Sequence, residues 1–103
     1  MAKRPYCGIY LILNKKTRQA YVGQSTDCHR RMNEHRSRNK SEIDQALTEH
    51  LKDFDFYYIK RCKPSQLDMW EDYYIYKYDA YENGYNQKVG RYYSYFKEKF
   101  QEK

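Results

Sequence analysis

Glycine, proline and cysteine are scarce in this chain of 103 residues, and it contains no long hydrophobic run. With four glycines and two prolines, the sequence has no Gly- or Pro-rich linker, so we expect a single domain over residues 1–103. The apolar runs are too short to span a bilayer, which argues against a membrane protein. A charged start followed by Pro5 does not resemble a signal peptide, and we expect a cytoplasmic protein.

The three cysteines, Cys7, Cys28 and Cys62, are an odd number and lie far apart. The sequence contains no Cys-x-x-Cys pair, and one thiol would remain single in any disulfide scheme. This pattern favours reduced thiols over a disulfide framework or a zinc site, in agreement with a cytoplasmic location.

Positive charge is in excess and is concentrated in the first part of the chain. The formal net charge is +6. Residues 1–40 contain ten Lys and Arg against two acids, whereas residues 41–103 contain ten against twelve. Concentrated positive charge favours a polyphosphate partner such as a nucleic acid, but a solvated basic surface explains the count equally well. Charge alone therefore leaves both alternatives open.

The pattern of apolar residues in the first half predicts a hairpin followed by two helices. Residues 6–23 alternate as a β-hairpin does, around a polar, basic turn at residues 14–18. Residues 25–27 offer N-caps for a helix that reaches about residue 37. A second helix is expected from Ser41 to about residue 50, because Ser41 and Asp44 have capping-box spacing. Its inward side chains would be Ile43, Leu47 and Leu51.

The second half of the chain predicts a third strand and two more helices. Residues 54–60 are aromatic and β-branched, as in a strand that joins the hairpin. A helix is expected with Ser65 as its N-cap, and a short terminal helix over residues 92–100. The predicted fold is α+β, in the order β-β-α-α-β-α-(α), with a small three-stranded, mainly antiparallel sheet flanked by helices. The core spans about residues 6–90, and residues 91–103 form a helical extension.

Glu71 interrupts an otherwise apolar stripe on the third helix. The stripe has helical spacing and consists of Leu67, Trp70, Tyr74, Ile75 and Tyr78. Burying an unpaired carboxylate costs several kcal/mol, roughly, unless a cation or hydrogen-bond donors compensate. Glu71 is therefore a candidate for metal binding or catalysis, or else a glutamate at the edge of the stripe that reaches solvent. Asp72 points about 100° away, and we expect it to be solvated.

Arg31 and His35 are four residues apart and share one face of the first helix, whereas Arg30 and Arg36 lie off that line. An arginine fork matches a phosphate, and a histidine one turn along could bond a phosphate oxygen or a tyrosine. The simpler alternative is an ordinary exposed basic helix. Asp27, four residues before Arg31, caps the helix or pairs with that arginine.

Tyr10 and Tyr21 lie on the two hairpin strands, close to Gly8 and Gly23. Direct pairing of the tyrosines would enclose ten residues, which requires a loop longer than two residues or a bulge. By themselves they fit ordinary cross-strand packing. A glycine within a strand often marks a close backbone approach, by a nucleic-acid backbone or by another element of the fold.

Taken together and in this order, these residues resemble the motif set of the GIY-YIG nucleases. The two triplets are Gly8-Ile9-Tyr10 and Tyr21-Val22-Gly23, in which valine replaces the usual isoleucine. A helix with Arg31 and His35 follows at the interval typical of the family. Glu71 corresponds to the late glutamate of the family, and Asn86 closes the set within an Asn-Gly-Tyr-Asn run. The resemblance covers about residues 6–90.

The resemblance implies a divalent-metal-dependent endonuclease that hydrolyses DNA phosphodiester bonds and leaves a 5′-phosphate and a 3′-hydroxyl. The implied catalytic residues are Tyr10, Tyr21, Arg31, His35, Glu71 and Asn86. Glu71 would hold one Mg²⁺ or Mn²⁺ together with substrate oxygens and waters, since magnesium suits a sparse carboxylate site.

A tyrosine is the general base in the implied mechanism. A free tyrosine has a pKa of about 10, so about one in a thousand is ionised at neutral pH. Tyr10 therefore needs help from Arg31, from the metal, or from a hydrogen bond with Tyr21 or His35. Arg31 would also stabilise charge on the phosphorus, and Asn86 would orient a phosphate or a group beside it.

We expect DNA to be bound mainly through its phosphates and with weak sequence preference. A homodimer or an additional specificity domain could add to the binding. The expected contacts are Gly23, Arg30, Arg31, Lys15, Lys16 and Arg18. Two alternatives remain. The first is a catalytically inactive nucleic-acid-binding module of the same fold, and the second is a small basic adaptor protein, which leaves Glu71 unexplained. The aromatic run at residues 92–96 either packs on the sheet or docks a partner or unpaired bases.

Overall fold

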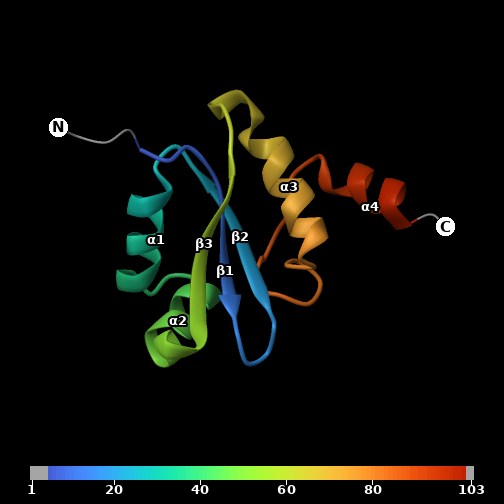
Figure 1. Ribbon diagram of the computed structural model, residues 1–103. Helices are drawn as coiled ribbons and strands as arrows, with labels where there is room; N and C mark the ends of the chain where they lie inside the picture. Colours follow the sequence, from blue (N-terminus) through green and yellow to red (C-terminus); the bar gives the residue numbers. More distant parts are fainter. Residues whose placement is uncertain (1–4, 102–103) are drawn as a thin grey trace.

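The computed structural model describes residues 5–101. The strands are β1 (Gly8–Asn14), β2 (Ala20–Ser25) and β3 (Phe54–Arg61), and the helices are α1 (Cys28–Ser37), α2 (Glu42–His50), α3 (Leu67–Lys77) and α4 (Tyr93–Gln101). The sheet has α1 and α2 on one face and α3, with α4 packed against it, on the other (Figure 1). The strand order is β2-β1-β3, and both pairs are antiparallel. The α+β class and the predicted order of elements are confirmed.

The register of the hairpin places the two tyrosines diagonally rather than opposite each other. Tyr10 lies opposite Gly23, and Tyr21 lies opposite Ile12. The phenols nevertheless meet on one face of the sheet, with ring centroids 6.3 Å apart. At the end of β1, the side chain of Asn14 accepts hydrogen bonds from two backbone amides of the turn, which stabilises the tight return of the chain.

Both faces of β1 are buried, because each is covered by a helical layer. Ile9 points toward α3 and packs in a cluster that includes Ile75. Tyr10 and Ile12 point toward α1 and α2, in a second cluster that includes Ile43. Alternate side chains of one strand thus enter two different cores, and the period of two places Tyr10 beneath α1.

The helix starts depend on the side chains that cap them. Asp27 accepts a hydrogen bond from a backbone amide in the first turn of α1, and Ser41 with Asp44 forms the predicted capping box of α2. The prediction that Ser65 caps the third helix is wrong. Pro64–Gln66 instead form a short 3₁₀ turn, and α3 follows directly from it.

The apolar residues near two helix ends differ in their burial. Leu51 was expected to point inward, but α2 ends before it and its side chain is 48% exposed. In α4, Tyr93 is buried, and Phe96 packs against Tyr73 of α3 with ring centroids 5.3 Å apart. Tyr95 remains exposed. Residues 102–103, which belong to the predicted extension, and residues 1–4 lie outside the described residues.

Within residues 5–101, no helix combines the length and the apolar character that crossing a bilayer requires. The three cysteines, all of which the structure describes, are free thiols. Cys28 is buried in the first turn of α1, and its Sγ lies 3.4 Å from the carbonyl oxygen of Gly8.

Candidate active site

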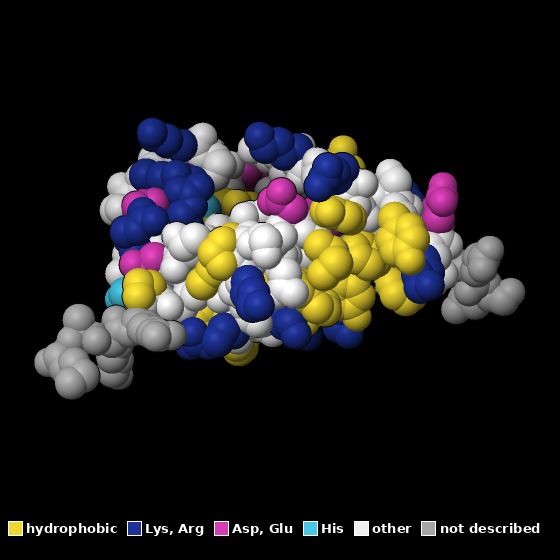
Figure 2. Space-filling view, turned by 90° about the horizontal axis from the view of Figure 1, so that it is seen from above, with side chains coloured by type: hydrophobic (Ala, Val, Ile, Leu, Met, Phe, Trp, Pro, Cys, Tyr) yellow, Lys and Arg dark blue, Asp and Glu magenta, His cyan; other side chains and the backbone are white. Residues whose placement is uncertain are grey.

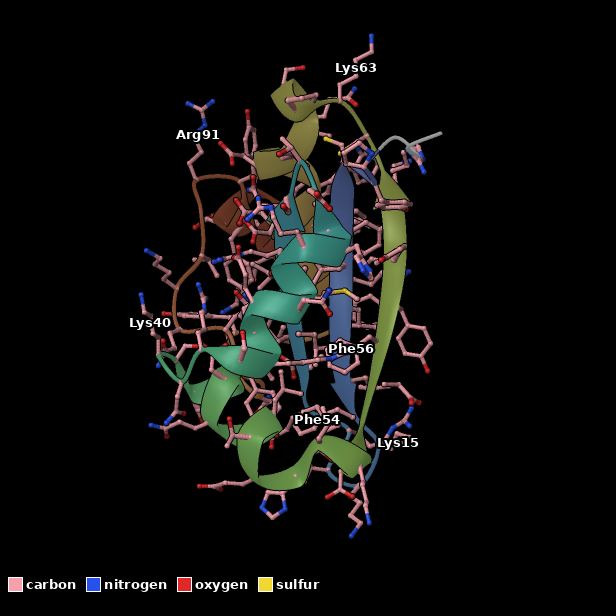
Figure 3. All side chains as sticks on the ribbon, turned by 90° about the vertical axis from the view of Figure 1, so that its left-hand side faces the viewer. Lys15, Lys40, Phe54, Phe56, Lys63 and Arg91 are labelled. Atoms are coloured by element: carbon pink, nitrogen blue, oxygen red, sulfur yellow. The ribbon has the colours of Figure 1, made fainter. Side chains whose placement is uncertain are left out.

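The outer edge of β2 borders a cleft of about 280 Å³. Because β2 is an outer strand, side chains from both helical layers can meet across its edge. Tyr21 and Arg38 line the cleft from the α1–α2 side, and Glu71 lines it from α3. The chain that follows α3 runs beside α1 and α2 (Figure 3) and adds Asn86 and Lys88. The cleft therefore brings together residues from the start and the end of the sequence motif.

Tyr10 is buried next to this cleft and bonded to His35. Its hydroxyl oxygen lies 2.8 Å from Nε2 of His35. The ring of Tyr21 is 6.3 Å from that of Tyr10 and 5.2 Å from that of His35, between centroids. His35 reaches this position because it shares the buried face of α1 with Cys28 and Met32, at helical spacing. The two predicted tyrosines and the predicted histidine thus form one cluster.

Neither phenol ionises readily by itself. Burial raises the pKa of Tyr10 well above its ordinary value, and the positive charge of Arg31 opposes this only in part. Burial also raises the pKa of Tyr21, with a further contribution from the charge of Glu71. In contrast, burial lowers the pKa of His35, which keeps the imidazole neutral near pH 7. A neutral imidazole can accept a proton from the hydroxyl bonded to it.

Gly23 makes room for the Tyr10 ring. A Cβ at Gly23 would collide with Cζ and the hydroxyl oxygen of Tyr10. The close approach expected at this glycine is therefore made by Tyr10 within the protein rather than by a nucleic acid. Gly8 similarly allows the carbonyl of Lys60 on β3 to come close.

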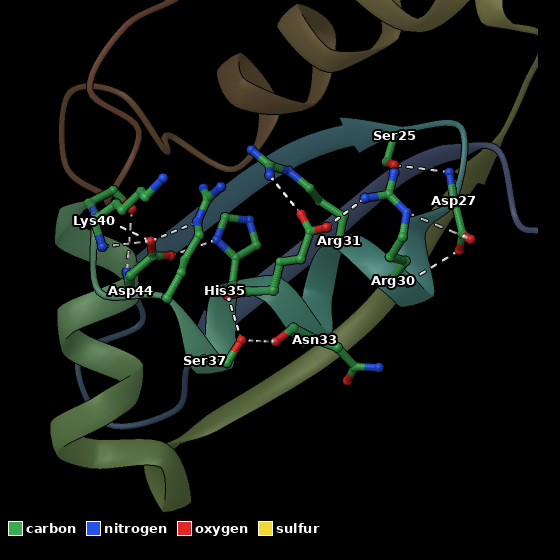
Figure 4. Close-up of polar contacts among 12 residues, drawn as sticks. Ser25, Asp27, Arg30, Arg31, Asn33, His35, Ser37, Lys40 and Asp44 are labelled. Carbon is green, nitrogen blue, oxygen red and sulfur yellow. Dashed lines mark hydrogen bonds and ion pairs between the residues drawn. The ribbon is translucent and has the colours of Figure 1, made fainter.

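Arg31 lies near the phenols but is partly engaged on its own helix. Its Nη1 donates to Glu34 at 3.0 Å, and Arg30 donates to the other oxygen of that carboxylate at 2.6 Å. The side chain of Arg31 is one-third exposed, at 32%, and its charge acts on Tyr10. Asp27 caps α1 and lies close to Arg30 rather than to Arg31 (Figure 4). Arg31 can therefore turn to an anion while Arg30 keeps Glu34.

Glu71 is held in place by Gln24 of β2. The side-chain amide of Gln24 donates to Glu71 at 2.9 Å and to Asp68 at 2.8 Å. Burial raises the pKa of Glu71 to about 7; the bond from Gln24 opposes this shift, whereas the charge of Asp72 adds to it. A buried carboxylate near other acids is stabilised by a divalent cation, which supplies the missing positive charge.

The donor set at Glu71 fits a cation that keeps most of its waters. Within residues 5–101, no group of three or more His, Cys, Asp or Glu side chains forms a complete metal cage. Mg²⁺ commonly binds through one or two carboxylates, with water and substrate phosphates in its other positions. Glu71 is therefore a suitable ligand for such an ion.

The prediction that Asp72 is solvated is wrong, because Asp72 is only 1% exposed. The chain after α3 folds back over this side of the helix, and its backbone amides replace water. Gly90 and Tyr92 donate to the two carboxylate oxygens at 2.9 Å and 2.8 Å. A Cβ at Gly90 would lie 2.7 Å from Asp72. Asp72 thereby anchors residues 87–91 along the cleft.

Asn86 fastens the same segment to the edge of β2. Its side-chain amide donates to the carbonyl of Val22 and accepts from the amide of Val22, both at 2.9 Å. This pairing satisfies backbone groups that an outer strand leaves open. The expected role of Asn86 in orienting a phosphate stays a prediction, since its observed bonds are to the backbone.

Asp44 belongs to the tyrosine cluster, although the sequence motif does not identify it. Its carboxylate is fully buried, and Oδ1 lies 2.7 Å from Nδ1 of His35 (Figure 4). The spacing from Ser41 indicated only a helix cap. Asp44 lies three residues before Leu47, whose side chain is buried. Because residues three apart share a helix face, this spacing is the signal in the sequence that Asp44 points inward.

The sequence profile of the GIY-YIG catalytic domain matches residues 6–86. The chain belongs to the GIY-YIG family. Among solved structures it is similar to the catalytic domain of the intron endonuclease I-TevI carrying a glutamate-to-alanine substitution, with a TM-score of 0.72, 20% identity, and coverage of 82% of this chain and 96% of that chain. It is also similar to the catalytic domain of the homing endonuclease I-TevI, with a TM-score of 0.70, 21% identity, and coverage of 80% and 98%. No curated protein matches the chain.

This GIY-YIG domain carries several basic residues around its cleft. Lys15 and Lys16, two of the expected DNA contacts, each lie 3.6 Å from an aspartate. Lys40 and Arg91 lie on the edge of the molecule beside the cleft, and Lys15 lies away from it (Figure 3). Figure 2 shows Lys and Arg side chains gathered around a hollowed part of one face. The basic residues near the cleft that the sequence did not single out are Arg38, Lys40, Lys88 and Arg91.

Proposed function

We propose that this GIY-YIG domain is a divalent-metal-dependent endonuclease that hydrolyses DNA phosphodiester bonds and leaves a 5′-phosphate and a 3′-hydroxyl. One observation carries the proposal: a hydrogen-bonded pair of Tyr10 and His35 lies beside the cleft that Glu71 lines. Phosphodiester hydrolysis needs a base for the attacking water and positive charge for the phosphate. The pair of Tyr10 and His35 offers the base, and Glu71 offers a site for a cation.

Tyr10 acts as the general base, with His35 as the acceptor of its proton. As the water oxygen bonds to phosphorus, the water gives a proton to the hydroxyl oxygen of Tyr10, and Tyr10 gives its own proton to Nε2 of His35. The bond from phosphorus to the 3′ oxygen breaks, and that oxygen takes a proton from solvent. Tyr10 thus need not ionise beforehand, which its raised pKa disfavours. A positioned base contributes about 10²–10⁴ in rate.

Positive charge for the phosphate comes first from Arg31. Its guanidinium can bind a phosphate oxygen once it leaves Glu34, and a fork of donors matches the geometry of the developing charge. Tyr21 borders the same cleft and packs against Tyr10 and His35, which holds both rings in place. Asn86 maintains the wall of the cleft through its bonds to β2.

Glu71 would hold one Mg²⁺ or Mn²⁺. When bound, the cation supplies positive charge to the phosphate oxygens and to the leaving oxygen. Gln24 keeps the carboxylate of Glu71 oriented before the cation arrives. Replacing Glu71 by glutamine removes the charge but preserves the volume, so the substitution tests this role directly.

DNA would be bound through its phosphates by basic residues around the cleft. The contacts expected from the sequence include Arg30, Arg31 and the basic turn residues. Lys40 and Arg91 join them because they lie beside the cleft. Such contacts carry little sequence information. A single site cuts one strand, so a double-strand break would need a homodimer, a further domain or a second binding event.

Nicking of supercoiled plasmid DNA tests the proposal. We expect nicking in Mg²⁺, none in EDTA, and large losses for Glu71→Gln, Tyr10→Phe and Arg31→Ala. Glu49→Gln is the matched control, because the side chain of Glu49 is 70% exposed on α2. A nick with a 5′-phosphate and a 3′-hydroxyl is sealed by DNA ligase without prior treatment, which checks the product ends.

Two outcomes would contradict the proposal. Nicking that survives EDTA and all three substitutions would rule out this site as the catalytic centre. Binding of DNA without cleavage in any divalent metal would favour the alternative, an inactive nucleic-acid-binding module of the same fold.

A further inference from the structure

The two carboxylate oxygens of Asp44 have different partners. Oδ2 accepts from Nε of Arg38 at 2.9 Å, from the Lys40 amide at 3.1 Å and from the Ser41 amide at 3.2 Å. Oδ1 faces Nδ1 of His35 at 2.7 Å. Three donors on one oxygen fix the rotation of the carboxylate, and the other oxygen is left to the histidine.

This environment keeps Asp44 ionised. Burial alone would raise its pKa, but the hydrogen bonds from His35, the Lys40 amide and Arg38 outweigh that effect and lower the pKa. An ionised carboxylate only accepts hydrogen bonds. The proton between the two groups therefore belongs to Nδ1 of His35, and Nε2 of the neutral ring carries a lone pair. Because that lone pair faces Tyr10 at 2.8 Å, the Tyr10 hydroxyl is the donor.

We propose that Asp44 is a positioning residue that fixes the tautomer of His35, so that Nε2 can accept the proton of Tyr10 during phosphodiester hydrolysis. This inference rests on the proposed function. In the reaction Tyr10 gains one proton from water and loses one to His35. The imidazolium that forms lies against the negative charge of Asp44, which stabilises it in the same way as a carboxylate stabilises the histidine of a hydrolase triad.

The capping of α2 does not by itself account for these contacts. The capping box uses the backbone amides at its start and the Ser41 hydroxyl, and it needs only Oδ2 of Asp44. Nothing in a helix cap requires the other oxygen to meet a histidine of a different helix. The same side chain therefore caps α2 and orients His35, and the two roles can be separated by substitution.

The charged and titratable groups around His35 come from every element packed against it. They are Asp44 from α2, Arg38 from the connection between α1 and α2, Arg31 from α1 itself, Tyr10 from β1 and Tyr21 from β2. Both arginines disfavour a charged imidazole, whereas Asp44 favours it. As a result, the imidazole of His35 is neutral before the reaction, and Asp44 stabilises the imidazolium that forms when it accepts the proton.

The first test is the protonation of His35 in the wild-type protein, read from its ¹⁵N NMR spectrum in the absence of metal and DNA. We expect hydrogen on Nδ1 and a bare Nε2. In Asp44→Asn, the amide nitrogen can donate to Nδ1, so the hydrogen should move to Nε2, which then competes with the Tyr10 hydroxyl as a donor. Hydrogen on Nε2 in the wild-type protein would overturn the proposal, and this result does not depend on how any variant folds.

The second test is the nicking rate at saturating DNA and Mg²⁺. Asp44→Asn should lose about 10²–10⁴ in rate, the range for a positioned proton acceptor. Ser41→Ala is the control, because it removes the capping hydroxyl but keeps the amide that bonds Asp44. Its rate should match the wild type, although loss of the cap lowers the urea concentration at which it unfolds. Equal rates in the two variants would overturn the proposal. Absence of nicking in the wild type would refute the proposed function instead, and the NMR result would still decide the tautomer.

Discussion

The two faces of the sheet both bury an aspartate, but they use it differently. On the α1–α2 face, Asp44 meets His35, which in turn meets Tyr10, so a line of side chains that can carry protons runs through the core. On the α3–α4 face, both oxygens of Asp72 bond to the backbone amides of Gly90 and Tyr92. A buried carboxylate can affect proton transfer where a titratable side chain faces it. Where backbone amides face it, the carboxylate holds the chain in position.

The α3–α4 face is otherwise built from aromatic contacts. Trp70 and Tyr73 pack edge to face with centroids 5.6 Å apart, and Tyr73 packs similarly on Phe96. Figure 2 shows hydrophobic side chains gathered on this part of the surface. Such pairs add stability beyond the area they bury. This face therefore supports α3, from which Glu71 reaches the cleft, while the other face carries His35, the proposed proton acceptor.

The largest expected effect comes from removing one buried tyrosine hydroxyl on each face of the sheet and comparing the nicking rates. Tyr10→Phe should lower the nicking rate by about 10²–10⁴, because the general base is lost. Tyr93→Phe removes a hydroxyl from a tyrosine that is also buried, on the α3–α4 face, and should leave the rate unchanged. The measurement is single-turnover nicking at saturating DNA. Equal losses in both variants would mean that the substitutions act through general loosening of the core.

Two glycines provide a second matched pair. Gly23→Ala forces the Tyr10 ring away from β2, and Gly90→Ala forces the loop away from Asp72. Overpacking of this kind costs about 1–3 kcal/mol, so both variants should unfold at lower urea concentration. Only Gly23→Ala disturbs the bond between Tyr10 and His35, and it should lose at least about tenfold in nicking rate. If Gly90→Ala slows nicking at saturating DNA as strongly as Gly23→Ala does, proton transfer does not depend specifically on the contact between Tyr10 and His35.

The arrangement of the fold could be predicted because its signals are local. Alternation along β1, the capping box at Ser41 and the stripe on α3 each depend on neighbours within a few residues. The motif residues likewise included Tyr10 and Glu71. The structure places Glu71 in the cleft at the edge of β2 and buries Tyr10 on β1 against Tyr21, which lines the same cleft.

The remaining features depend on contacts between distant parts of the chain. The burial of Asp72 follows from a loop that returns about eighteen residues later, and helical periodicity contains no information about that return. The contact between Asp44 and His35 joins two helices whose relative angle the sequence does not specify. The position of Arg91 beside the cleft also depends on the returning loop. The charge count gave no sign of it, because residues 41–103 have no excess of positive charge.

The α1–α2 face should also give the protein a characteristic loss of stability in acid. Burial lowers the pKa of His35 below its ordinary value of 6.5, and hydrogen bonds lower that of Asp44 below 3.8. For each group, the unfolded chain binds more protons than the folded one at pH values between the folded-state pKa and the unfolded-state pKa. Stability therefore falls as pH falls through that window. These two groups therefore make the free energy of unfolding decrease below pH 6.5 and decrease further below 3.8. Glu71, whose pKa is raised to about 7, has the opposite sign and opposes the decrease between that value and 4.5.

Urea titrations at a series of pH values check this expectation. His35→Gln should remove the decrease that begins below 6.5, whereas His50→Gln, at a histidine whose side chain is 63% exposed, should keep it. If His35→Gln and the wild type show the same change in stability between pH 7 and pH 5, His35 is not held neutral by its surroundings.

The smallest expected effect concerns the basic residues that flank the cleft from both faces. Lys40 follows α1, and Arg91 belongs to the loop that Asp72 anchors; both lie on the same edge of the molecule (Figure 3). If each contacts one DNA phosphate, its replacement by alanine should weaken binding uniformly across sequences and reduce the slope of log K against log salt by about 0.9.

Lys63→Ala is the control, because Lys63 lies at the end of the molecule, away from Lys40. Fluorescence anisotropy with duplex DNA at several salt concentrations measures the slopes. A reduction for Arg91→Ala but not for Lys40→Ala would indicate that DNA extends over the loop that Asp72 anchors and does not reach Lys40.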